Sequence, residues 1–345
     1  MNKSGEKYGY KSDNFNKSCD KLEKIFVKSY ENSTNISVKS IKIMTLNIWG
    51  IEKDNLVKYS FMEKRMNKIA EEILLNKPDI ICLQEISTSS FNFLNPLISK
   101  FYEFKSDDNI DTSEIIKTRN SIVTNIIYSK LKPQNFELYK LGGNLDYDNI
   151  LCVANYKNFS VLNIHVQAGS LFSPGQENVY KTYSRCRAQQ FGNINKIIKK
   201  NNIIKKNNKV ILCGDFNCHL DGSLSDWPEL KVIKDFKMID SFRKVNPQEK
   251  GYTEDTEQND MRWNYKFKDK KFRYDAILSK NLIPLNSKVI CNKGFSLTKE
   301  ESQEVINYLQ KRDMNINNLR YKKDTQDILE FWPSDHFGVI SEFKI

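Results

Sequence analysis

The sequence predicts an α/β protein in which helices cover the faces of β-sheets. Short apolar runs recur along the chain, and each ends in a polar residue followed by a turn signal, as in residues 41–47, 79–85 and 210–217. Between the first two runs, residues 61–75 carry apolar side chains at helical spacing, and Pro78 closes this segment. Hydrophobic residues make up 39% of the 345 residues, which supports a sizeable core at this length. Strands and helices in this order favour sheets with helices packed on their faces.

The rest of the chain continues this pattern. We expect further strands in residues 121–128, 150–155, 161–165 and 272–278, and further helices in residues 181–199 and 299–311. Ser296 and Thr298 are the capping pair of the last helix. Residues 109–119 are polar and are expected to form a loop near the site. Residues 279–331 are expected to be a long insertion that forms either a substrate wall or a surface decoration.

The chain is expected to hold one large domain. Its length would allow one large or two ordinary domains, but the chemically distinctive motifs extend from Asn47 to His336. Residues 1–38 are rich in Lys, Asn, Ser and Asp, with one weakly amphipathic piece near residues 19–30. We therefore expect a polar N-terminal extension followed by a single domain of residues 39–345.

Charge and cysteine content limit the cellular setting more than the substrate. The net charge of +11 and a pI near 9.1 suit a polyanionic partner, but Lys, Asn and Ile are abundant everywhere, as in residues 199–209, which indicates compositional bias. The seven cysteines are odd in number and show no metal-ligand spacing, which favours a reducing compartment, the cytoplasm or nucleus. No stretch approaches the ~20 apolar residues that span a bilayer. We expect an intracellular monomer without a transmembrane segment.

Polar residues at the ends of the apolar runs point to hydrolysis of a phosphate ester. Residues 210–213 are expected to be a buried strand that ends at Gly214. Asp215 and Asn217 then leave its carboxyl end, where open sheets present ligands. The chain has only three histidines, and His165, His219 and His336 all lie in or beside such sequences. This hydrolysis requires groups that neutralise charge on the phosphoryl oxygens, activate water and stabilise the leaving oxygen. The remaining candidates are Asn47, Glu85, Asp275 and Asp335.

The order of these motifs resembles the endonuclease/exonuclease/phosphatase superfamily, which includes pancreatic deoxyribonuclease, apurinic endonucleases, tyrosyl-DNA phosphodiesterase, inositol polyphosphate phosphatases and neutral sphingomyelinases. The resemblance covers about residues 41–345, and six ordered motifs are far more specific than any one of them. It implies a four-layered α-β-β-α sandwich of two packed, mainly antiparallel sheets flanked by helices. It also implies a phosphoric ester hydrolase that depends on Mg²⁺ or Mn²⁺.

By this resemblance, three residues hold the metal. Glu85 is the principal ligand, Asn47 lies beside it, and Asp335 is a second ligand; hard oxygen atoms of this kind suit Mg²⁺. The alternative for Glu85 is a carboxylate at a strand end that forms a surface salt bridge.

The resemblance assigns the catalytic roles to five residues. Asp215 orients or deprotonates the attacking water, and the Asn217 amide donates to a phosphoryl oxygen without becoming a competing anion. His165 donates to a nonbridging oxygen. His336 acts as acid, base or charged electrophile, and Asp275 fixes its tautomer and raises its pKa. The alternatives are an Asx turn at residues 215–217 and a packed core histidine at 165.

Three further residues carry weaker signals. His219 either lines the pocket or caps its loop. Arg185 or Arg187 could clamp a substrate phosphate from the helix, since a guanidinium matches phosphate geometry, although arginine on a helix is more often solvated.

Two branches of the superfamily compete for the substrate. Residues 251–259, followed by residues 273–275, resemble the pattern of tyrosyl-DNA phosphodiesterase, but an arginine expected near His219 is missing. Residues 165–168, 187–190 and 217–219 are instead similar to neutral sphingomyelinases, with no aromatic hairpin for lipid insertion beyond a partial role for Trp263 and Phe267. We therefore expect a nuclease or a phosphodiesterase of nucleic-acid ends. The alternatives are a sphingomyelinase-like phosphodiesterase acting on a lipid headgroup, an inositide-type phosphatase, and an inactive binding module, which would be expected to have lost Glu85, Asp215 or His336.

Overall fold

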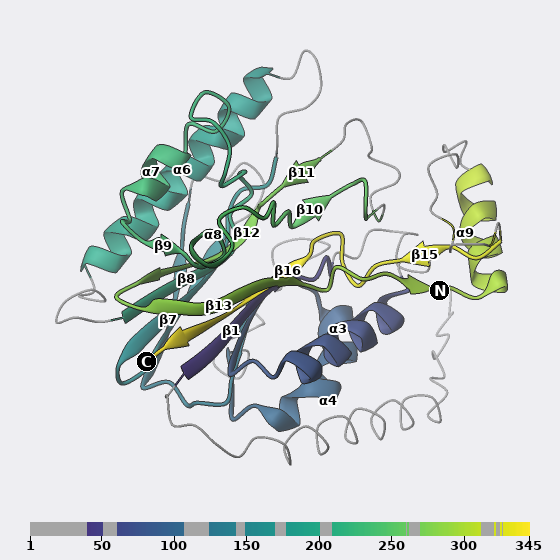
Figure 1. Ribbon diagram of the computed structural model, residues 1–345, viewed down its shortest axis with the longest axis horizontal. Coiled ribbons are helices and arrows are strands. Elements are labelled where there is room, and N and C mark those ends of the chain that lie inside the picture. Colours follow the sequence, from purple (N-terminus) through teal and green to yellow (C-terminus); the bar gives the residue numbers. More distant parts are fainter. Residues whose placement is uncertain are drawn as a thin grey trace, which may run out of the picture.

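The computed structural model forms two packed sheets with helices on both outer faces (Figure 1). It describes the following residues: 40–50, 61–106, 124–142, 149–169, 177–200, 209–259, 261, 270–311, 321, 325 and 327–345. The predicted N-terminal extension, the loop at 109–119, Trp263 and Phe267 lie outside these residues.

Each sheet has six strands, and all neighbours but one pair in each sheet are antiparallel. Sheet A has the order β13 (Ile283–Ile290), β16 (Gly338–Lys344), β1 (Ser40–Asn47), β2 (Ile80–Ile86), β4 (Thr124–Ser129) and β3 (Phe104–Lys105). Sheet B has the order β5 (Asn135–Lys140), β6 (Ile150–Asn155), β7 (Phe159–His165), β8 (Lys209–Asp215), β12 (Asp275–Lys280) and β9 (Ile239–Asp240). The predicted mainly antiparallel sheets are confirmed.

Three layers of apolar side chains hold the sandwich together. One layer lies between the sheets and includes Ile43, Val161 and Ile211. A second joins sheet A to α3 (Met62–Asn76) and α4 (Thr88–Ile98), and a third joins sheet B to α6 (Glu177–Lys200) and α7 (Leu230–Lys234). The four-layered α-β-β-α arrangement is therefore confirmed, and apolar burial on both faces of each sheet explains why the strands are apolar runs.

The two parallel pairs belong to equivalent βαβ units. β1 and β2 are parallel and joined through α3, and β7 and β8 are parallel and joined through α6. The carboxyl ends of parallel neighbours lie at the same edge of a sheet. Polar residues at the ends of these four strands are therefore brought to one edge of the sandwich.

The smaller elements close the ends and edges of the sheets. η1 (Ser99–Phe101) follows α4, and α8 (Ser241–Val245) packs against β12 and β13. Two short ribbons extend from the sandwich, one of β10 (Glu254–Asp255) with β11 (Lys271–Phe272) and one of β14 (Phe295–Ser296) with β15 (Glu330–Phe331). Figure 1 shows the second ribbon beside α9 (Lys299–Lys311) at one end of the molecule.

The segment 279–331 differs from its prediction as a single insertion. Its first part forms β13, which pairs with β16 along the edge of sheet A. The predicted helix at 299–311 is confirmed as α9. Of the predicted capping pair, Thr298 takes this role: the backbone N–H of Thr298 and that of Glu301 each donate to the other's side chain. Ser296 does not, because it belongs to β14. Val305 and Leu309 of α9 belong to an apolar cluster with Trp332 and Phe337, so this segment packs beside the C-terminal motif.

Two strand limits also differ from the prediction. Asp275 is the first residue of β12 instead of an interior one, because the chain changes partner between β11 and β12. Gly214 does not end β8, which continues to Asp215; its φ of +138° and the 1.9 Å between a hypothetical Cβ and the Ile164 carbonyl oxygen require glycine. None of the helices in the described part of the chain has the length and apolar character needed to cross a bilayer.

Candidate active site

Asp215 lies at the centre of the candidate site and contacts both sheets. Its Oδ1 accepts a hydrogen bond from the Asn217 backbone N–H at 2.8 Å, and its Oδ2 accepts one from Asn47 Nδ2 at 3.0 Å. Asn47 ends β1 of sheet A, whereas Asp215 ends β8 of sheet B. Both carboxylate oxygens are thus held in place, and the site spans the contact between the sheets.

The backbone of β2 is irregular at Glu85. Its φ is 54°, in the left-handed region, and the pairing with β4 shifts register between Leu83 and Ile86. The Gly50 N–H donates to the Glu85 carbonyl at 2.8 Å, and a Cβ at Gly50 would lie 2.3 Å from that oxygen. The distortion therefore depends on glycine at position 50, and it sets the direction of the Glu85 side chain. Backbone strain of this kind often accompanies function.

His165 lies between the two carboxylates. Its Nε2 is 3.6 Å from Glu85 Oε1 and 3.7 Å from Asp215 Oδ2, too far for a well-formed hydrogen bond to either. This nitrogen and Glu85 Oε2 are both buried without a hydrogen-bond partner in the described structure. Such groups are costly to bury unless a ligand or ion completes their bonding.

His336 and Asp275 form a buried pair on the other side of Asp215. His336 Nδ1 lies 2.8 Å from Asp275 Oδ2, and its Nε2 lies 3.9 Å from Asp215 Oδ2. Burial alone lowers the pKa of His336, but the charges of Asp275, Asp215 and Asp335 raise it well above its ordinary value. Burial raises the pKa of Asp275 to about 6, helped by Asp215 and opposed by His336. Near neutral pH the pair favours a protonated imidazole beside a carboxylate.

The predicted metal-side residues fit a hard divalent cation. Glu85 offers a buried carboxylate oxygen that has no partner in the described structure, as a cation ligand would. Ser334 Oγ donates to the Asn47 carbonyl at 2.6 Å and lies 3.3 Å from Asp335 Oδ1, which ties Asp335 to Asn47. A second group that could hold an ion consists of Asp215, Asp275 and His336. It fits less well, because Asp215 already accepts two hydrogen bonds and His336 Nδ1 is engaged by Asp275.

Asn217 is placed beside the site by its own hydrogen bonds. Its φ of 47° is tolerated by asparagine, and its Nδ2 donates to the Val166 carbonyl at 3.1 Å. That bond uses one of the two amide hydrogens, so the second remains for a substrate oxygen. The roles of all eight predicted residues remain proposals; the structure brings the eight to one place.

Residues whose functions the sequence did not indicate support the His336 segment. Thr253 Oγ1 accepts the backbone N–H groups of Tyr274 and Asp275 at 2.9 and 3.0 Å, and its carbonyl accepts the Phe337 N–H at 2.7 Å. Asn259 Nδ2 donates to the Ser334 carbonyl at 2.8 Å. Thr253 and Asn259 lie in residues 251–259. The resemblance of these residues to the tyrosyl-DNA phosphodiesterase pattern was the available signal for these contacts.

Two of the weaker candidates, His219 and Arg187, bond other parts of the fold. His219 Nδ1 accepts the backbone N–H of Arg273 at 3.1 Å, and burial lowers its pKa. Arg187 is fully buried and its Nε bonds Glu229 at 2.6 Å. Of the two predictions for His219, a loop-bracing role has direct support. Arg187 is neither solvated nor turned toward substrate.

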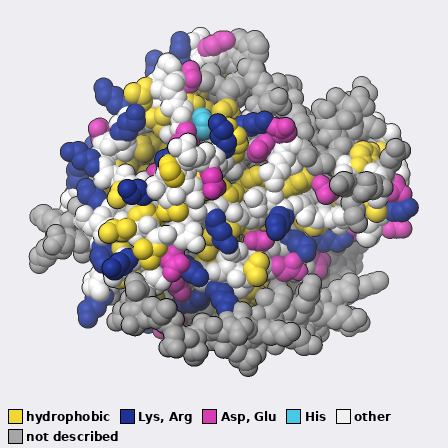
Figure 2. All heavy atoms as spheres, viewed as in Figure 1, with side chains coloured by type: hydrophobic (Ala, Val, Ile, Leu, Met, Phe, Trp, Pro, Cys, Tyr) yellow, Lys and Arg dark blue, Asp and Glu magenta, His cyan; other side chains and the backbone are white. Residues whose placement is uncertain are grey.

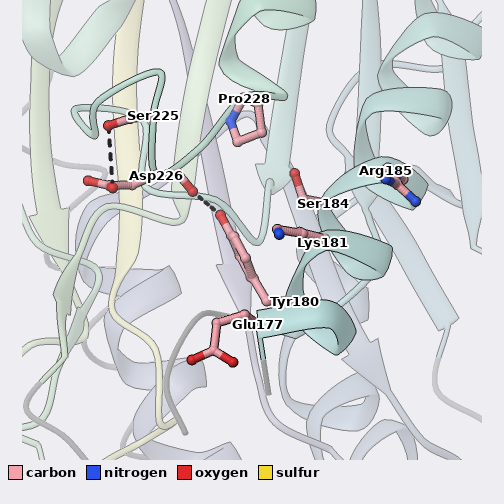
Figure 3. A pocket seen from close by; sticks show the side chains of 8 residues that line it. All are labelled: Glu177, Tyr180, Lys181, Ser184, Arg185, Ser225, Asp226 and Pro228. Carbon is pink, nitrogen blue, oxygen red and sulfur yellow. Dashed lines mark hydrogen bonds between the residues drawn. The ribbon is translucent and has the colours of Figure 1, made fainter. Parts of the chain in front are cut away.

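Arg185 is exposed and lines a separate pocket of about 350 Å³ on the outer side of α6. In Figure 3 this residue and Lys181 extend from the helix, and the hydroxyl of Tyr180 points to the loop at 225–228. Glu177 and Asp226 also line this pocket, so the basic side chains are matched by acidic ones.

The structure gathers carboxylates, amides and histidines at the common edge of the two sheets. A model of the Endonuclease/Exonuclease/phosphatase family matches residues 44–336, so the chain belongs to this family and is a phosphoric ester hydrolase.

Known proteins are similar to this chain at low sequence identity. The uncharacterized protein F14F9.5 of Caenorhabditis elegans is 22% identical over 341 residues, covering 91% of this chain and 94% of the relative. The mannosyl-6-phosphatase Bt3783 of Bacteroides thetaiotaomicron is 15% identical, with a TM-score of 0.60 and coverage of 88% of this chain and 100% of that one. TDP2 of D. rerio, complexed with a single-strand DNA product, is 15% identical, with a TM-score of 0.55 and coverage of 89% and 100%.

Proposed function

We propose that the protein is a Mg²⁺- or Mn²⁺-dependent phosphodiester hydrolase that acts on nucleic acid or its ends. The observation that carries the chemistry is the contrast between two carboxylates. Among the described residues, one carboxylate oxygen of Glu85 has no hydrogen-bond partner, whereas both oxygens of Asp215 accept hydrogen bonds. The first arrangement suits a cation ligand, and the second suits a group that must hold a fixed direction toward a water molecule.

The side chains of sheet B and the His336 segment act on the phosphate and on the water. His165 Nε2 and the free amide hydrogen of Asn217 donate to phosphoryl oxygens, where negative charge increases during the reaction. Asp215 orients the attacking water and accepts its proton. The protonated imidazole of His336, held by Asp275, stabilises the phosphoryl charge or gives a proton to the leaving oxygen.

Glu85, Asn47 and Asp335 would hold the metal ion, which neutralises negative charge on the phosphate when it is bound. In this proposal the Asp275–His336 pair does not coordinate the metal, because His336 Nδ1 is engaged by Asp275 and the pair serves the acid–base chemistry. This division of the site is the mechanistic core of the proposal.

One observation favours nucleic acid as the substrate: TDP2 of D. rerio, which shares the fold, is complexed with single-strand DNA product. Thr253 and Asn259 of the tyrosyl-DNA phosphodiesterase pattern bond the His336 segment inside the fold. The sphingomyelinase-like residues Gln167, Arg187 and Gln190 also bond inside the fold, so neither set identifies the substrate by itself. Basic and acidic side chains are interspersed on the face in Figure 2, so charge alone does not identify the substrate.

A panel of substrates tests this proposal. Purified protein is incubated with labelled DNA, RNA, 5′-tyrosyl DNA, an inositol polyphosphate and sphingomyelin vesicles, each with Mg²⁺ or with excess chelator. We expect hydrolysis of a nucleic-acid substrate that requires the metal. Full turnover in chelator would remove the metal role of Glu85, and cleavage of sphingomyelin or the inositide alone would replace the substrate assignment.

A binding assay with an inactive variant tests the substrate independently of the catalytic chemistry. The inactive Glu85→Ala protein is expected to bind a short oligonucleotide, with affinity that falls as salt rises because neutralised phosphates release counterions. Glu63 is exposed on α3, so the Glu63→Ala protein is the matched control for the loss of a carboxylate. Absent nucleic-acid binding together with tight association with neutral sphingomyelin vesicles would favour the lipid alternative.

A further inference from the structure

Two buried arginines occupy equivalent places in the two βαβ units. Arg65 lies in α3 and Arg187 in α6, and both side chains are fully buried. A buried arginine is rare because removing its charge from water is costly unless several partners compensate. The partners of these two residues therefore indicate why each is present.

Arg65 joins the segments that carry two of the three metal-side residues, Asn47 and Asp335. Its Nε donates to the Pro333 carbonyl at 2.9 Å, and its Nη2 donates to the carbonyls of Ile48 and Trp49, the latter at 2.9 Å. Its guanidinium also lies 5.1 Å from the centre of a Trp49 ring. Residues 48–49 directly follow Asn47, and Pro333 precedes Asp335 by two residues.

Arg187 holds the segment that follows His165. Its Nη1 donates to the carbonyls of Gln167 and Gly169 at 3.2 and 2.6 Å, while its Nε donates to Glu229. A second contact reinforces this segment, because the Gln167 N–H donates to Gln190 Oε1 at 2.8 Å. Gln190 also donates to Asn149, which in turn donates to the His165 carbonyl at 2.7 Å.

The charges of the two arginines are compensated differently. Arg187 forms a buried ion pair with Glu229 at 2.6 Å, away from the candidate metal side. The hydrogen bonds of Arg65 given above go to backbone carbonyls. Burial lowers the pKa of its guanidinium to about 10, and the charges of Asp335 and Glu85 oppose this shift. Arg187 is therefore balanced by a direct ion pair, whereas Arg65 is held by backbone carbonyls of the segments that carry Asn47 and Asp335.

We propose that Arg65 and Arg187 are positioning residues for two separable parts of the site. Arg65 fixes the backbone that presents Asn47 and Asp335 to the metal, and Arg187 fixes the backbone that presents His165 to the phosphate. This inference rests on the proposed metal-dependent function. Lysine cannot replace either residue fully, since an ammonium lacks the planar fork that reaches several carbonyls at once.

The test compares Arg65→Lys with Arg187→Lys, so that each variant is the control of the other. Mn²⁺ affinity is measured by electron paramagnetic resonance, and affinity for inorganic phosphate by calorimetry at a Mn²⁺ concentration that saturates each protein. We expect Arg65→Lys to weaken Mn²⁺ binding by about 10- to 100-fold, as for other residues that support metal ligands, with little effect from Arg187→Lys. Phosphate affinity should show the reverse pattern.

If the two arginines only stabilised the fold, their variants would not affect Mn²⁺ binding and phosphate binding differently. Equal effects of both variants on Mn²⁺ binding would overturn the inference while leaving the proposed function intact. Absence of Mn²⁺ binding by the wild-type protein would instead overturn the proposed function and, with it, this inference.

Circular dichroism establishes that each variant is folded. If Arg65→Lys does not fold, hydrogen exchange of the wild-type protein supplies the result: Mn²⁺ should protect the backbone around residues 47–50 and 333–336 more than residues 166–169. Equal protection of these segments would contradict the separation.

Discussion

The two halves of the sandwich have the same topology but different chemistry. Each contains a parallel strand pair, a connecting helix and a buried arginine on that helix. In sheet A the second strand presents Glu85 from a backbone irregularity with one carboxylate oxygen unpartnered in the described structure. In sheet B the second strand presents Asp215 directly after Gly214, whose φ is +138°, and both oxygens of Asp215 accept hydrogen bonds.

This comparison teaches that position alone does not determine the role of a carboxylate. Glu85 and Asp215 lie at equivalent strand ends, but hydrogen-bond saturation distinguishes them. A saturated carboxylate has a fixed direction, which suits proton transfer. An unsaturated and buried one needs a cation or donor to complete its bonding. The predictions below test this difference.

The largest effect is expected for Glu85→Gln. The substitution keeps the shape of the side chain and removes the charge that holds the metal, which is worth several kcal/mol of transition-state stabilisation. We expect kcat/KM to fall by about 10³-fold or more, since each 1.36 kcal/mol is tenfold in rate. Steady-state kinetics on the substrate found by the panel measure this, with Glu63→Gln as the control. A loss below tenfold would mean that Glu85 is not the principal ligand.

The next effects are expected in the acid–base groups of the other half. Asp215→Asn and His336→Ala should each lower kcat by about 10²-fold or more, the usual loss for an acid–base or electrostatic group. Asparagine at 215 retains the size of the side chain but cannot accept a proton from water. Near-normal kcat for both variants on the true substrate would refute these roles.

A smaller change with a distinct pH signature is expected for Asp275→Asn. Asp275 raises the pKa of His336 above its ordinary value of 6.5, so its removal should lower that pKa. His336 stabilises the fold fully below the unfolded pKa and loses this contribution as pH rises through the folded pKa. In the variant this loss, and the alkaline fall in activity, should move to lower pH. Nuclear magnetic resonance titration of the His336 ring in the metal-free protein checks the shift; an unchanged titration would show that Asp275 does not control it.

The smallest effect is expected for His219→Asn. The His219 ring accepts the Arg273 N–H, and among the described residues no hydrogen bond or ion pair joins it to Asp215 or His336. Since an amide oxygen can accept the same bond, kcat should change by less than about tenfold, well short of the loss of a catalytic acid or base. A loss comparable with that of His336→Ala would place His219 in the chemistry.

Local patterns predicted the strands, the helices and the strand-end residues, whereas the four-layered arrangement followed from the resemblance of the ordered motifs to a known superfamily. Apolar runs followed by polar residues located Asn47, Glu85, His165 and Asp215 at strand ends. Arg65 was missed, although it interrupts the apolar face of a helix, because its partners at 48, 49 and 333 are distant in sequence. The irregularity at Glu85 was also missed, since it depends on packing against Gly50 and on the pairing with β4.

The residues that resemble two branches of the superfamily illustrate a further limit of prediction from sequence. Gln167, Arg187 and Gln190 resemble residues of one branch, but in the fold they brace the segment after His165. Similar motifs can therefore reflect internal support instead of substrate recognition. Substrate choice depends on surfaces beyond these contacts.

The most direct test of the division between the halves is metal binding by two matched variants. Mn²⁺ affinity of Glu85→Gln and Asp215→Asn is measured by electron paramagnetic resonance in the absence of substrate. Each substitution exchanges one carboxylate for an amide of the same shape, so the two differ in which carboxylate is lost. We predict that Glu85→Gln abolishes tight binding while Asp215→Asn retains it. Loss of binding in Asp215→Asn with retention in Glu85→Gln would place the metal in the Asp215, Asp275 and His336 group and contradict the account.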